Sequence, residues 1–465
     1  MHYFLLTNRR IRTSICAMFT GGPATEPKIT VGIMDRRPEV SGRLDGLFHA
    51  GNLGPLSGSF SAKADKGICL LFDEAGQEVT RGPAIKLEAS PAGTFTLLNV
   101  TIGNQFHWER TEDQVFRGDL ILAARGETGI AAINEVPLEL YLASVISSEM
   151  HAAAPKEFLK AHAITSRSWL LAALQRKQGI RESPVPTGSR ITHDGELVRW
   201  YEREEHDLFD VCADDHCQRY QGITKIISVQ AGEAVSQTNG IVMVYNGEIC
   251  DARYAKACGG LTEDFDTAWE DKQIPYLTSI ADAPTPFRGI RTEEEAARWI
   301  LSGPQAYCNT RDEALLETIL PETDRETKNF FRWTVRYEAQ GLKEILLEKS
   351  GIDFGTIEAL VPLRRGPSGR LWRLKIVGSK ISVVVGKELE IRRWLSRSHL
   401  YSSAFIVNVE RDHRGRPEAF VLHGAGWGHG VGLCQIGAAV MASQGFTAEK
   451  ILKHYFQGAE IRKIY

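Results

Sequence analysis

The sequence has no long apolar run and little net charge, and each absence excludes a class of protein. No stretch approaches the roughly 20 consecutive apolar residues that a membrane-spanning helix needs. The net charge of −3 is too small to argue for a nucleic acid or an anionic surface as partner. With 43% hydrophobic and 24% charged residues, the 465-residue chain has an ordinary globular composition and is long enough for two or three domains.

The N-terminal residues show no convincing secretory signal, so either the start is misassigned or the signal is absent. Arg9, Arg10 and Arg12 precede only a short apolar stretch at residues 15–19. A signal peptide needs an apolar segment of about 7–15 residues after its charges. We therefore expect residues 1–28 to be a flexible N-terminal segment with no packed element and no convincing signal peptide.

Two helices are predicted in residues 135–175. Pro137 and Pro155 each suit the first turn of a helix, where the missing N–H of proline costs nothing. After Pro137, one helix face is formed by residues at steps of four, three and four, namely Leu138, Leu142, Val145 and Glu149. A carboxylate thus stands where the apolar stripe predicts another Leu or Val.

The position of Glu149 allows two interpretations. Burial disfavours the charged form of a carboxyl group, and a carboxyl that stays protonated near neutral pH can act as a general acid. Alternatively, Glu149 ends the helix and points at solvent, or pairs with Lys160 or Arg167. Periodicity by itself favours this second interpretation.

The motifs of this stretch resemble the core of the SpoIID/LytB family, whose members act on bacterial peptidoglycan. The matching residues are Glu135-Val136-Pro137, Tyr141-Leu142, Ser148-Glu149-Met150, Pro155, Leu159-Lys160-Ala161 and Arg167-Ser168. The resemblance resumes near Thr192 and at the C-terminus, and covers most of residues 125–285 and 400–465. It implies that Glu149 is the catalytic acid of a lytic transglycosylase, with Lys160 and Arg167 holding the substrate or tuning Glu149.

The expected fold is α+β, with a β-rich N-terminal region packed on a helical SpoIID-like core. Residues 29–125 alternate short apolar runs with Gly, Pro, Asn and Asp clusters, which predicts the β-rich part. The core with the active-site helices is expected at residues 126–285, and its C-terminal part at residues 401–465. Residues 286–400 carry ordinary helix, strand and turn signals, so we predict an inserted mixed α+β module outside the active groove.

Several local signals make narrower predictions. Residues 226–285 are predicted as a run of strands with a hairpin turn at Asn246-Gly247. Thr292 with Glu295 predicts a capping box at a helix start. Thr447 is the predicted N-cap of the last helix.

Two cysteines and two histidines lie close together in the chain. His206, Cys212, His216 and Cys217 are the ligand types of a tetrahedral zinc site, although their spacing is not that of a zinc finger. Spacing alone leaves two buried thiols and two surface histidines as an equal alternative. Some members of the family that the chain resembles carry a Cys/His zinc site in this region, which favours structural zinc. Four protein ligands would leave no place for a reactive water.

The resemblance implies that the segment from Tyr254 to Gly260 lines a glycan groove. The substrate-binding residues predicted in it are Tyr254, Cys258, Gly259 and Gly260. Cys258 could be a nucleophile in principle. No Cys-His-Asn arrangement supports that role, so a small buried thiol is the better interpretation.

The second family signature is the glycine-rich run at residues 423–437. Its glycines are too dense for a regular element and predict a tight loop that approaches a ligand closely. A metal site formed by His423 and His429 would lack a third ligand, and hydrogen bonding inside the turn is the other alternative. We predict instead that four residues line the groove beside Glu149, namely His423, Trp427, His429 and Gln435.

Residues and resemblance together predict a lytic transglycosylase of peptidoglycan glycan strands. Ordinary glycosidases need two carboxyl groups, whereas this reaction needs one. Glu149 would protonate the glycosidic oxygen, and the C6 hydroxyl of the substrate would attack the anomeric carbon. Glu149 would then accept the hydroxyl proton, leaving a 1,6-anhydro sugar. Because the substrate lies in the cell envelope, the protein is expected there.

Two alternatives stay open. Some relatives are enhancers of cell-wall amidases that bind glycan without cutting it, and in that case an amidase is a further partner. A zinc hydrolase would need an open metal site and is disfavoured. Retention of Glu149 and Lys160 favours the enzyme over the enhancer.

Overall fold

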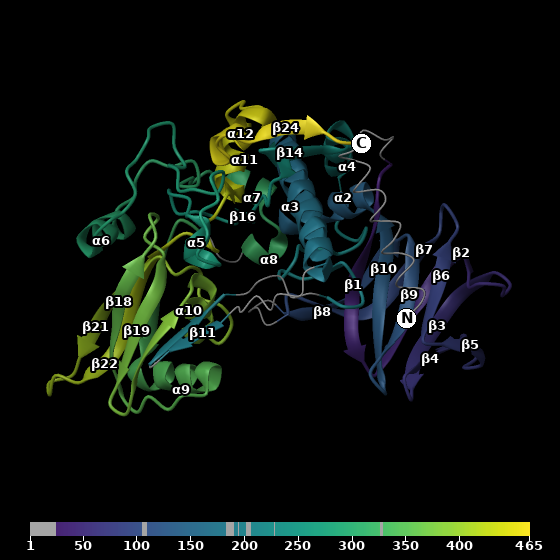
Figure 1. The fold of residues 1–465 in the computed structure, drawn as a ribbon, viewed down its shortest axis with the longest axis horizontal. Helices are drawn as coiled ribbons and strands as arrows, with labels where there is room; N and C mark the ends of the chain where they lie inside the picture. Colours follow the sequence, from purple (N-terminus) through teal and green to yellow (C-terminus); the bar gives the residue numbers. More distant parts are fainter. Residues whose placement is uncertain are drawn as a thin grey trace.

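Two β-rich lobes flank a helical centre, as Figure 1 shows. The computed structural model describes residues 25–104, 109–182, 190–193, 195–200, 206–226, 228–325 and 329–465. The predictions made for residues 1–24, among them the one about a signal peptide, lie outside these ranges. The architecture is mixed α+β, as expected.

The N-terminal lobe is a mostly antiparallel sheet. Its strands are β1 (Lys28–Arg37), β2 (Glu39–His49), β3 (Leu56–Asp65), β4 (Ile68–Phe72), β5 (Glu78–Gly82), β6 (Ala84–Ala89), β7 (Thr94–Ile102), β8 (Arg110–Arg117), β9 (Asp119–Arg125), β10 (Gly129–Pro137) and the short β13 (Val211–Cys212). They follow the order β13-β1-β10-β9-β6-β2-β3-β4-β5, and β7 pairs with both β2 and β8. Inside the lobe, the Phe95 ring lies 5.3 Å from Phe116 and 6.4 Å from Phe48. The β-rich prediction for this region is therefore confirmed.

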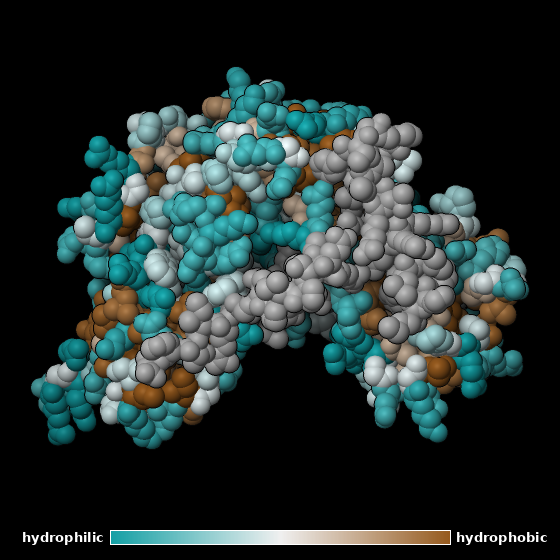
Figure 2. Space-filling view, viewed as in Figure 1, coloured by the Kyte–Doolittle hydropathy of each residue, from teal (hydrophilic) through white to brown (hydrophobic). Residues whose placement is uncertain are grey.

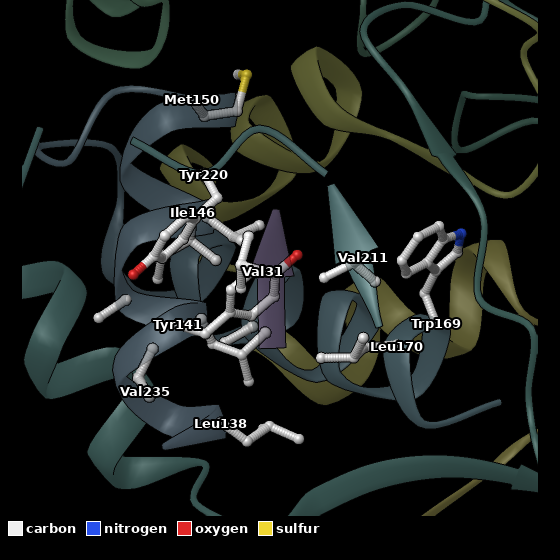
Figure 3. Packing of buried hydrophobic residues seen from close by; sticks show 14 of the residues in the cluster. Val31, Leu138, Tyr141, Ile146, Met150, Trp169, Leu170, Val211, Tyr220 and Val235 are labelled. Carbon is white, nitrogen blue, oxygen red and sulfur yellow. The ribbon is translucent and has the colours of Figure 1, made fainter. Parts of the chain in front are cut away.

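A row of aromatic rings joins this lobe to the helical centre. Phe116 on β8 lies 5.9 Å from Tyr220, and Tyr220 stacks on Tyr141 at 5.1 Å. The Tyr220 hydroxyl donates to the side-chain oxygen of Asn134 at 2.6 Å, so its polar end is satisfied inside the core. Figure 3 shows Tyr220 and Tyr141 among the buried side chains of this region.

The helical centre surrounds α2 (Leu138–Glu149). This helix begins directly after Pro137, as predicted, and every residue from Tyr141 to Glu149 is buried. The sequence predicted one buried face on this helix. The structure buries all of its faces between residues 141 and 149, because other segments of the chain pack around it. The other helices of the centre are α3 (Lys156–Glu182), α4 (Val229–Gln237), α11 (Gln435–Ser443) and α12 (Ala448–Tyr455).

The run of strands predicted for residues 226–285 is wrong at its start. Residues 229–237 form α4, whose N-cap Ser228 accepts a hydrogen bond from the backbone of Gln230. A serine N-cap before an Ala-containing stretch is a helix signal that could have been used. The remaining elements are short, namely β14 (Ile241–Tyr245), β15 (Glu248–Ile249), β16 (Tyr254–Ala255), α5 (Phe265–Ala268) and the C-terminal β24 (Glu460–Lys463), which pairs with β14.

Three local predictions are confirmed. The β14–β15 hairpin turns at Asn246 and Gly247, which both have positive φ, as a type I′ turn requires. Thr292 accepts from the backbone of Glu295, and the Glu295 carboxylate accepts from the backbone of Arg291. Thr447 accepts from the backbone of Lys450 at the start of α12.

The second lobe contains two sheets and recruits strands from outside residues 286–400. One sheet has the order β11-β12-β20-β19-β18, and the other has β17-β22-β21. Its strands are β11 (Arg190–His193), β12 (Glu196–Arg199), β17 (Arg332–Glu338), β18 (Ile357–Arg365), β19 (Leu371–Gly378), β20 (Ser382–Gly386), β21 (Phe405–Arg411) and β22 (Pro417–Ala425). The helices from this part of the chain are α6 (Glu293–Leu301), α7 (Glu313–Ile319), α8 (Glu322–Arg325), α9 (Ala339–Ser350) and α10 (Glu388–Trp394).

The surface in the same view is uneven in polarity. Figure 2 shows mostly hydrophilic residues over the helical centre and patches of hydrophobic residues over both β-rich lobes. Within the described ranges, no helix has the length and apolar character needed to cross a membrane.

Candidate active site

Glu149 is held at the end of α2 by donors from two distant segments. The side chain is 8% exposed. Its Oε1 accepts from the backbone N–H of Arg219 at 3.1 Å and from the Tyr254 hydroxyl at 3.1 Å. Its backbone carbonyl accepts from Lys256 Nζ at 2.8 Å. The alternative that Glu149 points at solvent is therefore wrong, and the carboxyl group has a defined orientation.

A buried network of charges continues from these contacts. Lys256 pairs with Asp324 at 2.7 Å, while Arg219 pairs with Asp215 at 2.5 Å and with Asp324 at 3.7 Å. Burial works against the charge of Arg219, but Asp215, Asp324 and Glu149 together hold its pKa above the ordinary value. Burial raises the pKa of Asp215, and Arg219 opposes that shift. The network thus combines three carboxyl groups with two cations.

Asp324 corrects the prediction that residues 286–400 lie outside the active site. It follows α7 in the second half of the chain and sits on α8, yet its carboxylate pairs with both cations that contact Glu149. The backbone N–H of His151, two residues after Glu149, also donates to the Ile319 carbonyl at 3.0 Å. Part of the predicted insertion therefore forms one wall of the site.

A buried, neutral histidine on α3 packs against the ring of Tyr254. His162 on α3 is completely buried, and its ring lies edge-on to Tyr254 at 4.9 Å. Burial, with a contribution from Lys256, lowers the pKa of His162 to about 3. Its Nε2 lies 3.2 Å from the side-chain nitrogen of Gln435, which is itself buried. The predicted residues Tyr254 and Gln435 thus meet on the α3 side of Glu149.

Arg167 has a structural role in place of the predicted contact with substrate. Its guanidinium is 0% exposed and donates to both carboxylate oxygens of Glu139 and to the Ile241 carbonyl. A buried group with these partners has no surface to offer a glycan. Lys160 pairs with Glu157 on the surface of α3 at 2.7 Å. Among the described residues, neither cation is a hydrogen-bond partner of Glu149, so the predicted pairing is not found.

Glycines 259 and 260 serve close packing inside the protein. Gly259 has φ +83° and Gly260 has φ +105°. A Cβ at Gly259 would lie 2.8 Å from the backbone nitrogen of Gly426, and one at Gly260 would lie 2.8 Å from the Trp299 ring. Their small size is therefore required by neighbouring protein atoms. Cys258 beside them is buried, as the thiol interpretation predicts.

The glycine-rich run is partly regular, because β22 extends through Ala425. His423 lies in this strand and contacts the Thr334 hydroxyl at 3.1 Å, within the second lobe. The predicted loop conformation at His423 is therefore wrong, because the residue lies in a strand. Sheet pairing, which glycine at position 424 permits against the Trp333 ring, decides its conformation.

Trp427 and His429 follow the strand and pack on other aromatic rings. The Trp427 ring lies 4.9 Å from Phe330 and 4.6 Å from Tyr401. His429 Nδ1 accepts from the backbone of Val431 at 3.0 Å, and its ring also bonds to the backbone of Tyr254. Burial, followed by nearby arginines, lowers the pKa of His429 well below the ordinary value. His429 therefore supports the Tyr254 strand as a neutral ring.

The four predicted metal ligands converge. All their ligand atoms lie within 4.8 Å of one another. The Cys217 sulfur is 3.4 Å from His206 Nε2 and 3.4 Å from His216 Nδ1, and the Cys212 sulfur is 3.7 Å from His216 Nδ1. Zinc bonds of about 2.3 Å to sulfur and about 2.0 Å to nitrogen place tetrahedral ligands roughly 3.5 Å apart. The donor set and its spacing fit zinc.

This Cys/His cluster is connected to Glu149 through the chain. Arg219 follows Cys217 by two residues, and its backbone N–H bonds Glu149. A cavity of about 570 Å³ lies beside the cluster, with Asp35, Arg36, Asp214 and Arg219 among the residues that line it. The cavity has a mixed polar and apolar lining and reaches the same arginine that bonds Glu149.

Comparison with known proteins agrees with the motifs. Residues 126–245, which include Glu149 and the Cys/His cluster, match the family described as Stage II sporulation protein, SpoIID. This match and the relatives described below support the resemblance of the chain to the SpoIID/LytB family. Residues 263–432 match a second family, described as a domain of unknown function (DUF8618). This second match includes β21 and β22, in agreement with the sheet pairing of the second lobe.

Three bacterial proteins are similar to this chain. Stage II sporulation protein D of Bacillus subtilis (strain 168) is 24% identical over 336 residues, covering 72% of this chain and 77% of that protein. Its counterpart in Bacillus amyloliquefaciens is 24% identical over 332 residues, covering 71% and 75%. The amidase enhancer of Bacillus subtilis is 25% identical over 242 residues, covering 49% of this chain and 32% of the enhancer.

Site residues that the sequence reasoning missed are Arg219, Lys256, Asp324, Asp215 and His162. Lys256 lies two residues from Tyr254 in a segment already singled out, and alternation in a short strand could have suggested it. Asp324 carried no such signal, since only the folded chain brings α8 to the end of α2.

Proposed function

We propose that this protein acts on peptidoglycan as a lytic transglycosylase, with Glu149 as general acid and then base. The observation that carries the proposal is the buried, oriented Glu149 carboxyl with Tyr254 and Arg219 as donors. The relatives named for sporulation and amidase enhancement support the substrate class. A cell-envelope location follows from that substrate.

The hydrogen bonds assign different tasks to the two oxygens of Glu149. Oε1 already accepts from Arg219 and Tyr254, so an acidic proton is carried by Oε2. Oε2 donates this proton to the glycosidic oxygen. The carboxylate then accepts the proton of the C6 hydroxyl as that oxygen attacks the anomeric carbon.

The other carboxylates support a reaction with a single acid. A two-carboxylate glycosidase needs a second group that faces the sugar as nucleophile or base. Asp215 and Asp324 are instead engaged by Arg219 and Lys256. Their ion pairs hold the cations that position Glu149, which favours intramolecular attack by the substrate itself.

We further propose that His206, Cys212, His216 and Cys217 hold one structural zinc ion. Zinc would fix the conformation of the loop that carries Arg219, and four protein ligands would keep a reactive water from the metal. Every acid–base step is therefore assigned to protein groups and none to the metal.

The second candidate function is that of an amidase enhancer, which the match to the Bacillus subtilis enhancer favours. The deciding experiment incubates the full-length protein with purified peptidoglycan and with glycan strands freed of stem peptides, followed by mass spectrometry. Release of 1,6-anhydro products by the wild type but not by Glu149→Gln supports the enzyme. Glycan binding without such products, together with faster cleavage by an added cell-wall amidase, would support the enhancer.

A further inference from the structure

We propose a second metal site, a closed zinc site formed by Cys258, Asp282, Cys308 and Cys434. The four side chains come from separate segments of the chain, and all are buried. Their ligand atoms lie within 4.8 Å of one another, and the Cys258 and Cys308 sulfurs are 3.7 Å apart. The site is distinct from the Cys/His cluster and supplies no group to the proposed reaction.

The spacing suits one tetrahedral ion. Zinc–sulfur bonds of about 2.3 Å place two thiolates of a tetrahedral site roughly 3.8 Å apart, close to the separation of Cys258 and Cys308. Three thiolates favour a thiophilic ion such as zinc over magnesium or calcium, which prefer oxygen ligands. With four protein ligands the site is closed, which is typical of a structural ion.

Backbone and side-chain donors are arranged to stabilise the ionised ligands. The N–H of Cys258 donates to the Cys434 sulfur at 3.2 Å. The N–H of Cys308 and the Tyr455 hydroxyl donate to the two oxygens of Asp282 at 2.9 and 2.5 Å. Cys434 is also the N-cap residue of α11, where the helix dipole favours a thiolate. Such outer contacts orient metal ligands.

Two guanidinium groups offset the charge that a metal centre would leave. Three thiolates, one carboxylate and Zn²⁺ sum to a net charge of −2, because binding releases the ligand protons to solvent. Arg370 donates to the Cys258 carbonyl at 3.0 Å, and Arg332 donates to the Gly259 carbonyl at 3.0 Å. Both positively charged guanidinium groups therefore lie against the backbone at residues 258 and 259.

A disulfide explains less of the cluster. It would join two of the three sulfurs at about 2.05 Å and would not explain why the third thiol and the carboxyl group lie beside them. Coordination of one ion accounts for all four side chains.

The site would brace the candidate active site. β16 and β23 (Leu433–Cys434) pair in parallel, so that Tyr254 lies opposite Leu433 and Ala255 opposite Cys434. Tyr254 bonds Glu149, and Gln435, directly after Cys434, reaches His162 behind Tyr254. An ion at Cys434 and Cys258 would therefore tie both segments to Asp282 and Cys308 in the DUF8618 region.

The test is the metal content of the full-length protein, purified with reductant and without chelators, measured by elemental mass spectrometry. We expect about two zinc ions per chain, one in Cys217→Ser and one in Cys308→Ser. The matched control Cys250→Ser removes a buried thiol that belongs to neither cluster, and it should keep two. A wild type with a single zinc that Cys217→Ser removes and Cys308→Ser retains would overturn the proposal.

A second measurement covers the case in which Cys308→Ser fails to fold. Cobalt(II) loaded into Cys217→Ser should still give thiolate charge-transfer absorption, and chelation should expose Cys258, Cys308 and Cys434 together to alkylation. A metal-free protein whose intact mass is two daltons lower without reductant, with Cys258 joined to Cys308, would show a disulfide and reject the metal site.

Discussion

The hydroxyl of Tyr254 donates to Oε1 of Glu149 at 3.1 Å, joining the short strand β16 to the end of helix α2. The two residues are 105 positions apart in the chain. This contact links the two parts of the site that the motifs single out separately, and it is the basis of the first two predictions.

Glu149→Gln should preserve the fold and glycan binding but lower the release of anhydro products by about 10²- to 10⁴-fold, the usual contribution of general acid–base catalysis. The measurement is product formation from purified peptidoglycan, with the melting temperature checked in parallel. Glu233→Gln is the matched control, because Glu233 forms only an exposed pair with Lys156. Equal turnover in the wild type and Glu149→Gln would contradict the mechanism.

Tyr254→Phe should lower kcat about fivefold with little change in melting temperature. The substitution removes one donor to Glu149, worth about 1 kcal/mol, and keeps the ring that packs on His162. Tyr276→Phe is a useful comparison, since the Tyr276 hydroxyl accepts from the backbone of Asp251 away from Glu149. A larger loss of activity in Tyr276→Phe than in Tyr254→Phe would argue against the assignment.

Cys217→Ser should lose one zinc ion and melt at a lower temperature, because the free energy of metal binding is part of the free energy of folding. Turnover should fall as well, since the loop that carries Arg219 is no longer fixed. Elemental analysis and thermal unfolding, each with and without chelator, measure both effects. An unchanged melting temperature after complete metal removal would refute the structural zinc.

Asp324→Asn should destabilise the protein by roughly 3–5 kcal/mol, the cost of removing one partner from a buried ion pair. The change leaves Lys256 without its 2.7 Å partner and weakens the hold on Arg219. Chemical unfolding measures the loss. Glu317→Gln on the exposed face of α7 should have almost no effect. Equal effects of the two variants would contradict the role of Asp324 in the charge network.

Glu263→Gln should change how stability depends on pH. Burial raises the pKa of Glu263 to about 7, against the opposing effects of Ser368 and Arg370. Between pH 4.5 and 7 the native state keeps a proton that the unfolded state releases, so the wild type loses stability as pH rises through this window. The loss is at most about 3 kcal/mol, at roughly 1.4 kcal/mol per pKa unit.

The measurement for Glu263 is the unfolding free energy at pH 5, 6, 7 and 8. Glu263→Gln stays neutral and should lack this part of the decline, so its stability relative to the wild type should increase toward pH 8. Parallel pH profiles for the two proteins would show that Glu263 does not titrate as expected.

Local rules were sufficient for much of the fold. Pro137 marks the start of α2, and the threonines at positions 292 and 447 cap helices as predicted. The Asn246-Gly247 turn forms because two adjacent residues must adopt positive φ there. Each of these outcomes depends on residues within a few positions of one another, which is why the sequence alone could predict them. The family motifs also identified Glu149, and the ligand types of four nearby Cys and His residues predicted the cluster that converges.

Tertiary structure decided the identity of the partners. Arg167 matches the family motif, yet Glu139 and Ile241 occupy its guanidinium. Asp324 belongs to a region predicted to lie elsewhere, yet it pairs with Lys256 and Arg219. A buried charge is stable only beside an opposite charge, and the fold decides which distant residue supplies it. A local sequence pattern contains no information about that pairing.

The glycine-rich run shows the same division between sequence and structure. The high density of glycines in this run indicates that other atoms approach its backbone closely, and the sequence alone was enough to infer this. Only the folded chain determined what approaches: at Gly426 it is the backbone carbonyl of Ala257, and at Gly430 it is the guanidinium of Arg370. The physical reason is that the missing side chain of a glycine is a property of that residue alone. The atom that packs against it belongs to a distant part of the chain and is brought there by the fold.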